Sequence, residues 1–199
     1  MTIGDRVYAQ AISRLRELVD EATRRGEPDA SSAALATASA SGAPSVRTID
    51  VFRLGVSGAV FFANAHSGKA FQLRENPRAA LCWYWPQLRY QAVMEGAAEL
   101  LADDEADACW NSQTREKQLG GWASEQSQPL QDEAGLRRAQ DEVQDRFRME
   151  RVPRPAGWCA FQLVPSRIGI WQTGWKRLHA KRIYERGQDG SWSVTEVGP

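Results

Sequence analysis

The first apolar pattern along the chain has the period of a helix. After residue 5, apolar side chains recur at spacings of three and four, which places them on one face of a helix. This stripe consists of Ile12, Leu15, Val19 and Ala22. Asp5 is a suitable capping residue at the start, and Gly26 and Pro28 end the pattern. The chain is therefore predicted to begin with an amphipathic helix.

The pattern then changes to short apolar runs separated by turn residues, which is typical of strands. These runs cover 33–39, 45–54, 59–64, 79–85, 88–101, 158–163, 167–171, 181–185 and 191–197. A short helix capped by Ser67 is predicted through Asn76, and helical periodicity returns over 103–110, 116–124 and 132–149. Strands on both sides of a helical insertion at about 103–149 predict a single domain over residues 1–199. Its class is mainly β with helices, built as an antiparallel barrel that the helices decorate.

Charge and hydropathy exclude several classes of protein. The 25 basic residues balance the 25 acidic ones, whereas a general nucleic-acid-binding protein carries a basic excess. The N-terminus has no apolar leader core, and no run approaches ~18 apolar residues. We therefore expect no signal peptide, no nucleic-acid partner, no membrane partner and a cytoplasmic location. The three cysteines (Cys82, Cys109 and Cys159) lie far apart, which predicts neither a disulfide framework nor a metal site.

Candidate chemistry gathers around Arg47 and the segment 61–69. Here a predicted strand runs into a helix start that is capped by Ser67 and followed by Lys69. Such a start offers backbone N–H groups, the positive end of the helix dipole and an ammonium at one point. With Arg47 on a neighbouring strand, this point is suited to a phosphate monoester. The alternative is a surface arginine and a solvated lysine. Glycine-rich phosphate loops are absent, so a phosphorylated cofactor would depend on these side chains.

Other stretches carry unusually specific residues. One is Leu-Arg-Tyr-Gln at 88–91, and another is Gly-Trp-Ala-Ser-Glu-Gln-Ser at 121–127. A Val-Pro-Arg-Pro connector follows at 152–155, and Trp-Gln-Thr-Gly-Trp-Lys-Arg-Leu-His lies at 171–179. In this order, the motifs resemble the pyridoxamine 5'-phosphate oxidase family over nearly the whole chain. The resemblance implies an FMN-binding split β-barrel and a homodimer that binds two FMN molecules across the subunit interface.

The resemblance also assigns cofactor residues. Family members hold the FMN phosphate with an arginine and a lysine that match Arg47 and Lys69, the pair already selected for a phosphate. The other positions assigned to the cofactor are Phe62, Ala63, Ser67, Gln91, Gln126, Ser127, Trp171 and Lys181. The chain departs from the family where Phe62 and Ala63 replace a Tyr-Thr pair and where Lys181 replaces an arginine.

The substrate pocket departs further from the family pattern. The catalytic pair that the resemblance implies is intact: Arg177 over the substrate ring and His179 hydrogen-bonded to it. The family grips the substrate's phosphate with a lysine, a tyrosine, an arginine and a serine. The matching positions here are Phe52, Cys109, Gln113 and Lys117. The Lys-to-Phe change removes a charge that a phosphate needs, and either Arg115 or Lys117 is available as a relocated cation.

The resemblance implies an FMN-dependent oxidase of a small nitrogen heterocycle. A C–H next to nitrogen would lose a hydride to FMN, with oxygen as the final acceptor. Pyridoxamine or pyridoxine 5'-phosphate is the family's default substrate. A second branch, the flavin oxidases of phenazine biosynthesis, acts on larger rings without a phosphate, and the aromatic run at 81–85 is similar to that branch. A non-catalytic FMN-binding protein is a third interpretation, which the intact Arg177 and His179 argue against.

Overall fold

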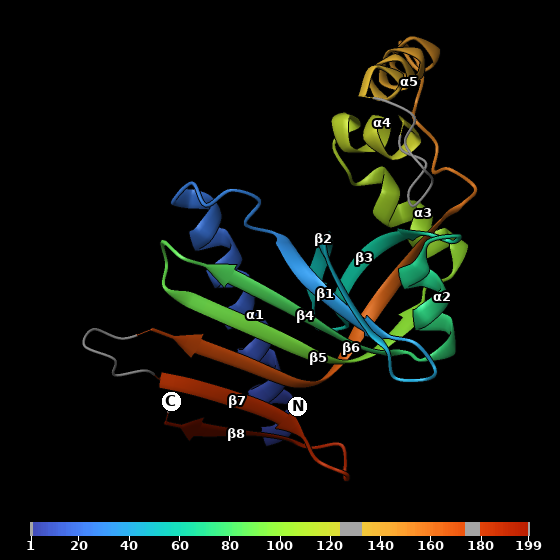
Figure 1. The fold of residues 1–199 in the computed structure, drawn as a ribbon. Coiled ribbons are helices and arrows are strands. Elements are labelled where there is room, and N and C mark those ends of the chain that lie inside the picture. The colour runs from blue at the N-terminus through green and yellow to red at the C-terminus, as the bar shows by residue number, and fades with distance from the viewer. Residues whose placement is uncertain (1, 124–132, 174–179, 199) are drawn as a thin grey trace.

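The structure is a computed structural model that describes residues 2–123, 133–173 and 180–198, and it confirms a mainly β protein with helices around the sheet (Figure 1). The strands are β1 (Ser32–Ala38), β2 (Pro44–Gly55), β3 (Gly58–Asn64), β4 (Arg78–Trp85), β5 (Tyr90–Leu100), β6 (Trp158–Gln172), β7 (Ala180–Arg186) and β8 (Trp192–Val197). The helices are α1 (Ile3–Arg24), α2 (Gly68–Glu75), α3 (Asp103–Asn111), α4 (Arg115–Ala123) and α5 (Glu133–Arg146). None of the helices in the described part of the chain is long and apolar enough to cross a membrane.

Strand β6 closes the barrel. The strands follow the order β3-β2-β1-β4-β5-β6-β7-β8, and an additional antiparallel pairing joins β3 to β6. The first half of β6 pairs with β3, its second half pairs with β7, and both halves pair with β5. Strands β1–β6 therefore form a closed barrel, and β7 and β8 extend the sheet beyond it.

The prediction of two separate strands at 158–163 and 167–171 is wrong, because β6 runs through without a break. The break was expected between them, where Pro165 lacks a backbone N–H. In the structure Pro165 pairs with Gly96, and the β5–β6 register shifts between Glu95 and Gly96. The extra residue of this bulge is Ser166 on β6, next to the proline, and pairing continues on both sides of it.

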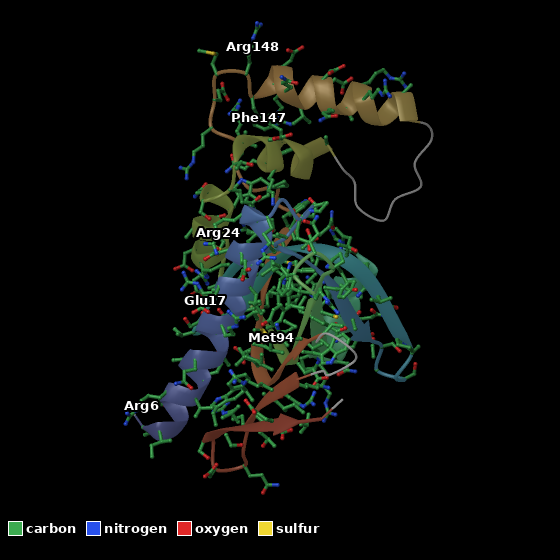
Figure 2. The ribbon with its side chains drawn as sticks, turned by 90° about the vertical axis from the view of Figure 1, so that its left-hand side faces the viewer. Arg6, Glu17, Arg24, Met94, Phe147 and Arg148 are labelled. Carbon is green, nitrogen blue, oxygen red and sulfur yellow. The ribbon has the colours of Figure 1, made fainter. Side chains whose placement is uncertain are left out.

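Helix α1 covers one side of the sheet and contacts β2, β7 and β8. Its buried residues include Ile12, Leu15, Leu18 and Ala22, as the amphipathic pattern predicts. The cap differs from the prediction: Thr2 is the N-cap, and Asp5 completes a capping box by accepting a hydrogen bond from the backbone N–H of Thr2 at 2.7 Å. Figure 2 shows Met94 among the side chains inside the barrel, where it is fully buried.

The buried apolar residues form two clusters. The first fills the barrel and includes Leu35, Phe61, Leu81 and Met94. The second lies between the barrel and the helical insertion, and its members are Val60, Phe62, Ala106, Cys109, Trp110, Phe147, Val152 and Ala160. In Figure 1, α3, α4 and α5 stand together at one end of the barrel. The second cluster therefore fixes the helices to that end.

We expect Gly96→Ala to lower the free energy of unfolding by about 1–3 kcal/mol. A Cβ at Gly96 would overlap the carbonyl oxygen of Val164, which is backbone and cannot rotate away. Gly55→Ala is the matched control, since Gly55 also lies on a strand and has open space around it. Urea unfolding of the two variants measures both values. Equal stability in the two variants would show that the β5–β6 bulge tolerates a side chain.

Candidate functional site

Arg47 lies on β2 and points toward α2. Its Nη1 donates to Thr37 Oγ1 at 2.6 Å and to the carbonyl oxygen of Leu35 at 3.3 Å. Its Nη2 lies 3.5 Å from Oε1 of Gln72, a residue of α2. Burial lowers the pKa of the Arg47 guanidinium from its ordinary value. These contacts hold the side chain in one place beside the helix.

The start of α2 brings a second cation to Arg47. Ser67 is 1 % exposed and caps the helix: its Oγ accepts from the backbone N–H of Ala70 at 3.4 Å and donates to the carbonyl oxygen of Asn64 at 2.7 Å. Lys69 follows in the first turn and is half-buried. Burial lowers the pKa of Lys69, and the positive charge of Arg47 lowers it further. The structure thus places the predicted phosphate pair close enough for the two charges to repel each other.

A cavity of about 390 Å³ extends from Lys69 along the barrel wall. Its lining consists of Asp29, Ser32, Thr48, Ile49, Asp50, Phe52, Phe62, Lys69 and Trp158. The rings of Phe52 and Phe62 meet edge to face with centroids 5.0 Å apart, and Trp158 lies 6.3 Å from Phe62. The cavity therefore combines a cation at one end with an aromatic wall, a surface suited to a flat ring.

A second cavity, of about 450 Å³, lies between α4 and α5. Arg115, Glu116, Leu119, Gln140, Gln144 and Arg148 line it, and it contains none of the predicted cofactor residues. Although it is larger, its lining has no aromatic side chain to hold a flat ring. The cavity at Lys69 is the better candidate for the functional site.

Three other predicted cofactor residues form a row across the sheet. Gln91 pairs with Trp171 across β5 and β6, and Trp171 pairs with Lys181 across β6 and β7. Residues directly opposite each other in antiparallel strands point to the same face. That face is the outer one, because the intervening residues Ala92 and Ile170 are buried in the barrel. These three positions lie far apart in the sequence, and strand register brings them together.

The row lies on the same face of the sheet as the cavity. Thr48 in the cavity lining pairs with Ala34 on β1, and Ala34 pairs with Cys82 on β4. Cys82 pairs in turn with Val93 on β5, two residues from Gln91. Between β2 and β5 there are three steps from strand to strand, or roughly 14 Å at ~4.8 Å a step. The predicted cofactor residues therefore form two groups on one surface.

The four substrate positions lie near one another, at or beside this cavity. The Nζ of Lys117 lies 3.1 Å from Oδ2 of Asp50 and 5.4 Å from the ring centroid of Phe52. Cys109 is 5 % exposed and belongs to the second apolar cluster, against which Phe52 packs. The Nε2 atom of Gln113 is buried without a hydrogen-bond partner. Arg115 points elsewhere: it donates to the carbonyl oxygens of Phe147 and Glu150.

The comparisons with known proteins show the family of the chain. Residues 19–147 match the model of the pyridoxamine 5'-phosphate oxidase family, and residues 158–199 match the C-terminal dimerisation region of pyridoxine 5'-phosphate oxidase. The chain is 46% identical over 188 residues to the pyridoxine/pyridoxamine 5'-phosphate oxidase of Anaeromyxobacter dehalogenans, covering 94% of each chain. It belongs to the pyridoxamine 5'-phosphate oxidase family. The chain is accordingly an FMN-dependent oxidoreductase, and FMN is its cofactor.

Other relatives of this oxidase show how the family varies. The pyridoxine/pyridoxamine 5'-phosphate oxidase of Myxococcus xanthus is 38% identical, over 94% of this chain and 91% of that one. PhzG from Burkholderia lata, solved in complex with tetrahydrophenazine-1-carboxylic acid, superposes with a TM-score of 0.84. It is 28% identical, and the match covers 94% of this chain and 92% of PhzG. The oxidase is thus similar both to vitamin-type members of its family and to the phenazine branch.

The residues present fit an FMN molecule. Arg47 and Lys69 are two partly buried cations; burial lowers the pKa of both, the charge of Arg47 lowers that of Lys69 further, and a phosphate dianion beside them would relieve that repulsion. The aromatic wall of Phe52 and Phe62 continues from this point. Ala63 is fully buried in the barrel core, and Ser67 is engaged as the helix cap.

Six residues that line the cavity were not predicted from the sequence, and four predicted residues lie outside the described part of the chain; the six are Asp29, Ser32, Thr48, Ile49, Asp50 and Trp158. Asp50 was missed, although it lies two residues before Phe52 on the same strand and lines the same cavity. Its partner Lys117 is 67 residues away in the sequence, so no local pattern joins them. Gln126, Ser127, Arg177 and His179 lie outside the described residues, and their roles stay predictions.

We expect Lys69→Met to weaken FMN binding by roughly ten- to a hundredfold, because it removes one charged contact of about 1.5–3 kcal/mol. Arg47→Ala should have a loss of the same order. Arg53→Ala is the control, since Arg53 is an exposed arginine of the same strand. Fluorescence titration of the FMN-free protein measures the three affinities. Unchanged FMN affinity in both variants would place the phosphate elsewhere.

Proposed function

We propose that this chain is a homodimeric oxidase of a flat nitrogen heterocycle, with a substrate pocket that does not depend on a phosphate group. The observation that carries the proposal is the wall formed by Phe52 and Phe62, with Lys117 bound to Asp50 beside it. The family grips a substrate phosphate at this place with full positive charges. Here an aromatic ring and a neutralised lysine occupy it.

The cofactor's phosphate would be held by Arg47 and Lys69 at the start of α2. The flavin ring would then extend along the cavity toward Phe62 and Trp158. The flavin would be contacted from the other subunit by its Gln91, Trp171 and Lys181. The same residues of the first subunit lie roughly 14 Å from the cavity on the same surface, so a second copy must supply these contacts. Ala63, Ser67, Gln126 and Ser127 complete the proposed set of cofactor positions.

Bound FMN supplies the redox chemistry, by accepting a hydride from a C–H next to nitrogen, and oxygen is the proposed final acceptor. The chain's own residues position the substrate. Arg177 is proposed to lie over the substrate ring, and His179 to hydrogen-bond to it. Phe52 and Phe62 would exclude water from one side of the ring. The intact Arg177 and His179 support an oxidase over a protein that only carries FMN.

The altered positions of the substrate pocket indicate a substrate without a phosphate. Phe52 cannot bind a phosphate, Cys109 is buried in the apolar cluster, and Gln113 carries no charge. PhzG provides a precedent within the fold for a ring that carries a carboxylate and no phosphate. A larger, unphosphorylated heterocycle is therefore the leading substrate.

Pyridoxamine or pyridoxine 5'-phosphate is the second candidate, and the 46% identical relative favours it. It would require a new cation for the phosphate. Lys117 is the better placed of the two available residues, since Arg115 is held by its bonds to Phe147 and Glu150, in the segment that follows α5. Lys117 itself is already paired with Asp50.

The homodimer is supported by the outer face of the sheet. Val46 and Tyr84 lie on this face and are 71% and 63% exposed. The match to a dimerisation region covers β6, β7 and β8. A second copy on this face would cover these apolar side chains and would bring its own row of Gln91, Trp171 and Lys181 to the flavin.

Light scattering should give a particle of twice the chain mass of 22.2 kDa. We expect Tyr84→Lys to raise the dimer dissociation constant by at least about thirtyfold, because it places a charge where an aromatic side chain would be buried. Tyr84→Phe is the control and should stay dimeric. A wild-type monomer that still retains FMN would contradict both the dimer and the shared flavin site.

Steady-state kinetics should separate the two substrate classes. We expect little preference for pyridoxine 5'-phosphate over pyridoxine, since losing two charged contacts of ~1.5–3 kcal/mol each weakens phosphate-dependent binding by about two to four orders of magnitude. A reduced phenazine carboxylate should be oxidised more efficiently than either. Efficient turnover of pyridoxine 5'-phosphate with a KM in the micromolar range would favour the second candidate instead.

A further inference from the structure

Asp50 is a carboxylate fixed in the wall of the cavity. Ser32 Oγ donates to its Oδ1 at 2.7 Å, and Lys117 Nζ donates to its Oδ2 at 3.1 Å. Burial acts to raise the pKa of Asp50, but these two hydrogen bonds and the charge of Lys117 outweigh it, so the pKa lies below its ordinary value. Each oxygen thus has a donor, and the carboxylate is ionised and held in place at neutral pH.

The charges of the cavity are arranged in two groups. At one end, Lys69 lies in the lining with Arg47 close behind it. At the other end, Asp50 is joined by Lys117, and Asp29 is a second carboxylate of the lining. The positive charge of Lys117 is balanced by the negative charge of Asp50. The first end therefore favours a phosphate, and the second end does not.

Phe52 helps to hold the ammonium of Lys117 beside Asp50. Its ring lines the same cavity as Asp50 and lies 5.4 Å from Lys117 Nζ, so the ammonium is held between a carboxylate and an aromatic face. An anion that approaches Lys117 must displace Asp50 or lie beside it. A dianion would meet more repulsion there than a neutral group or a single carboxylate.

We propose, on the basis of the proposed function, that Asp50 is a specificity-determining residue that excludes phosphorylated substrates by occupying Lys117 and repelling a phosphate dianion. The pocket then selects flat heterocycles that are neutral or carry one negative charge. The alternative role for the pair is structural, as a tether between α4 and β2. A half-exposed tether of this kind contributes at most about 1 kcal/mol to stability and does not discriminate between ligands.

The direct test is equilibrium dialysis of the FMN-loaded enzyme with 4-deoxypyridoxine 5'-phosphate and with 4-deoxypyridoxine. Neither compound carries the hydroxyl that would be oxidised, so binding is measured without turnover. In Asp50→Asn we expect the phosphate ester to bind roughly tenfold more tightly, because Lys117 is released and the repulsion is gone. The affinity for the unphosphorylated compound should not change.

Further variants show whether the effect acts through Lys117. Adding Lys117→Met to Asp50→Asn should abolish the gain, because the released cation is then absent. Asp50→Leu should raise the affinity for the phosphate ester as much as Asp50→Asn does. Leucine makes no side-chain hydrogen bond, so this variant excludes an effect of a new hydrogen bond from the asparagine. Asp29→Asn is the matched control, since it removes the other carboxylate of the lining at a left-handed residue (φ 48°) that asparagine tolerates.

The outcomes separate this proposal from the proposed function. Unchanged discrimination in both Asp50 variants, or an equal gain in Asp29→Asn, would overturn the role of Asp50 and would leave the oxidase proposal standing. Failure of the wild-type enzyme to oxidise any of the heterocycles would overturn the oxidase proposal, whereas the dialysis would still report on Asp50. A gain confined to the phosphate ester and dependent on Lys117 would establish the proposal.

Discussion

The antiparallel pairing of β6 with β3 is the contact on which the rest of the molecule depends. A sheet of this length would otherwise have an open edge at β3, with unpaired backbone groups over Phe61 and Phe62. Closure buries that edge and brings the end of β3, the start of α2 and the base of the helical insertion to one end of the barrel. The cavity lies there because those elements meet there.

The second half of β6 pairs with a different strand. It leaves β3 and pairs with β7, which carries Trp171 onto the outer face beside Gln91 and Lys181. One strand thus contributes to the closed barrel and to the surface on which a second subunit is expected. The strands between β2 and β5 set how far apart the two groups of predicted cofactor residues lie, and this separation is the physical reason for expecting each flavin site to need two chains.

Local signals in the sequence predicted much of the fold and one part of the site. Arg47 and Lys69 were found because a helix cap and two cations are visible within a short segment and its neighbouring strand. Asp50 was not found, since its interpretation depends on Lys117, a residue of α4 in the helical insertion that only folding brings to it. The two predicted strands that proved to be β6 show the same limit: the proline is visible locally, whereas the bulge beside it becomes visible only in the pairing with β5.

The second apolar cluster has a consequence for how such an enzyme can diverge. It holds α3, α4 and α5 against the barrel through side chains such as Trp110 and Cys109, separately from the side chains that fill the barrel itself. Substitutions in that helical layer can change the shape of the cavity wall while the barrel, Arg47 and Lys69 keep their packing. A lineage can in this way exchange one heterocycle for another without first losing the ability to fold. The second cluster makes this possible because it separates the packing of the variable helical layer from the packing of the conserved barrel fold.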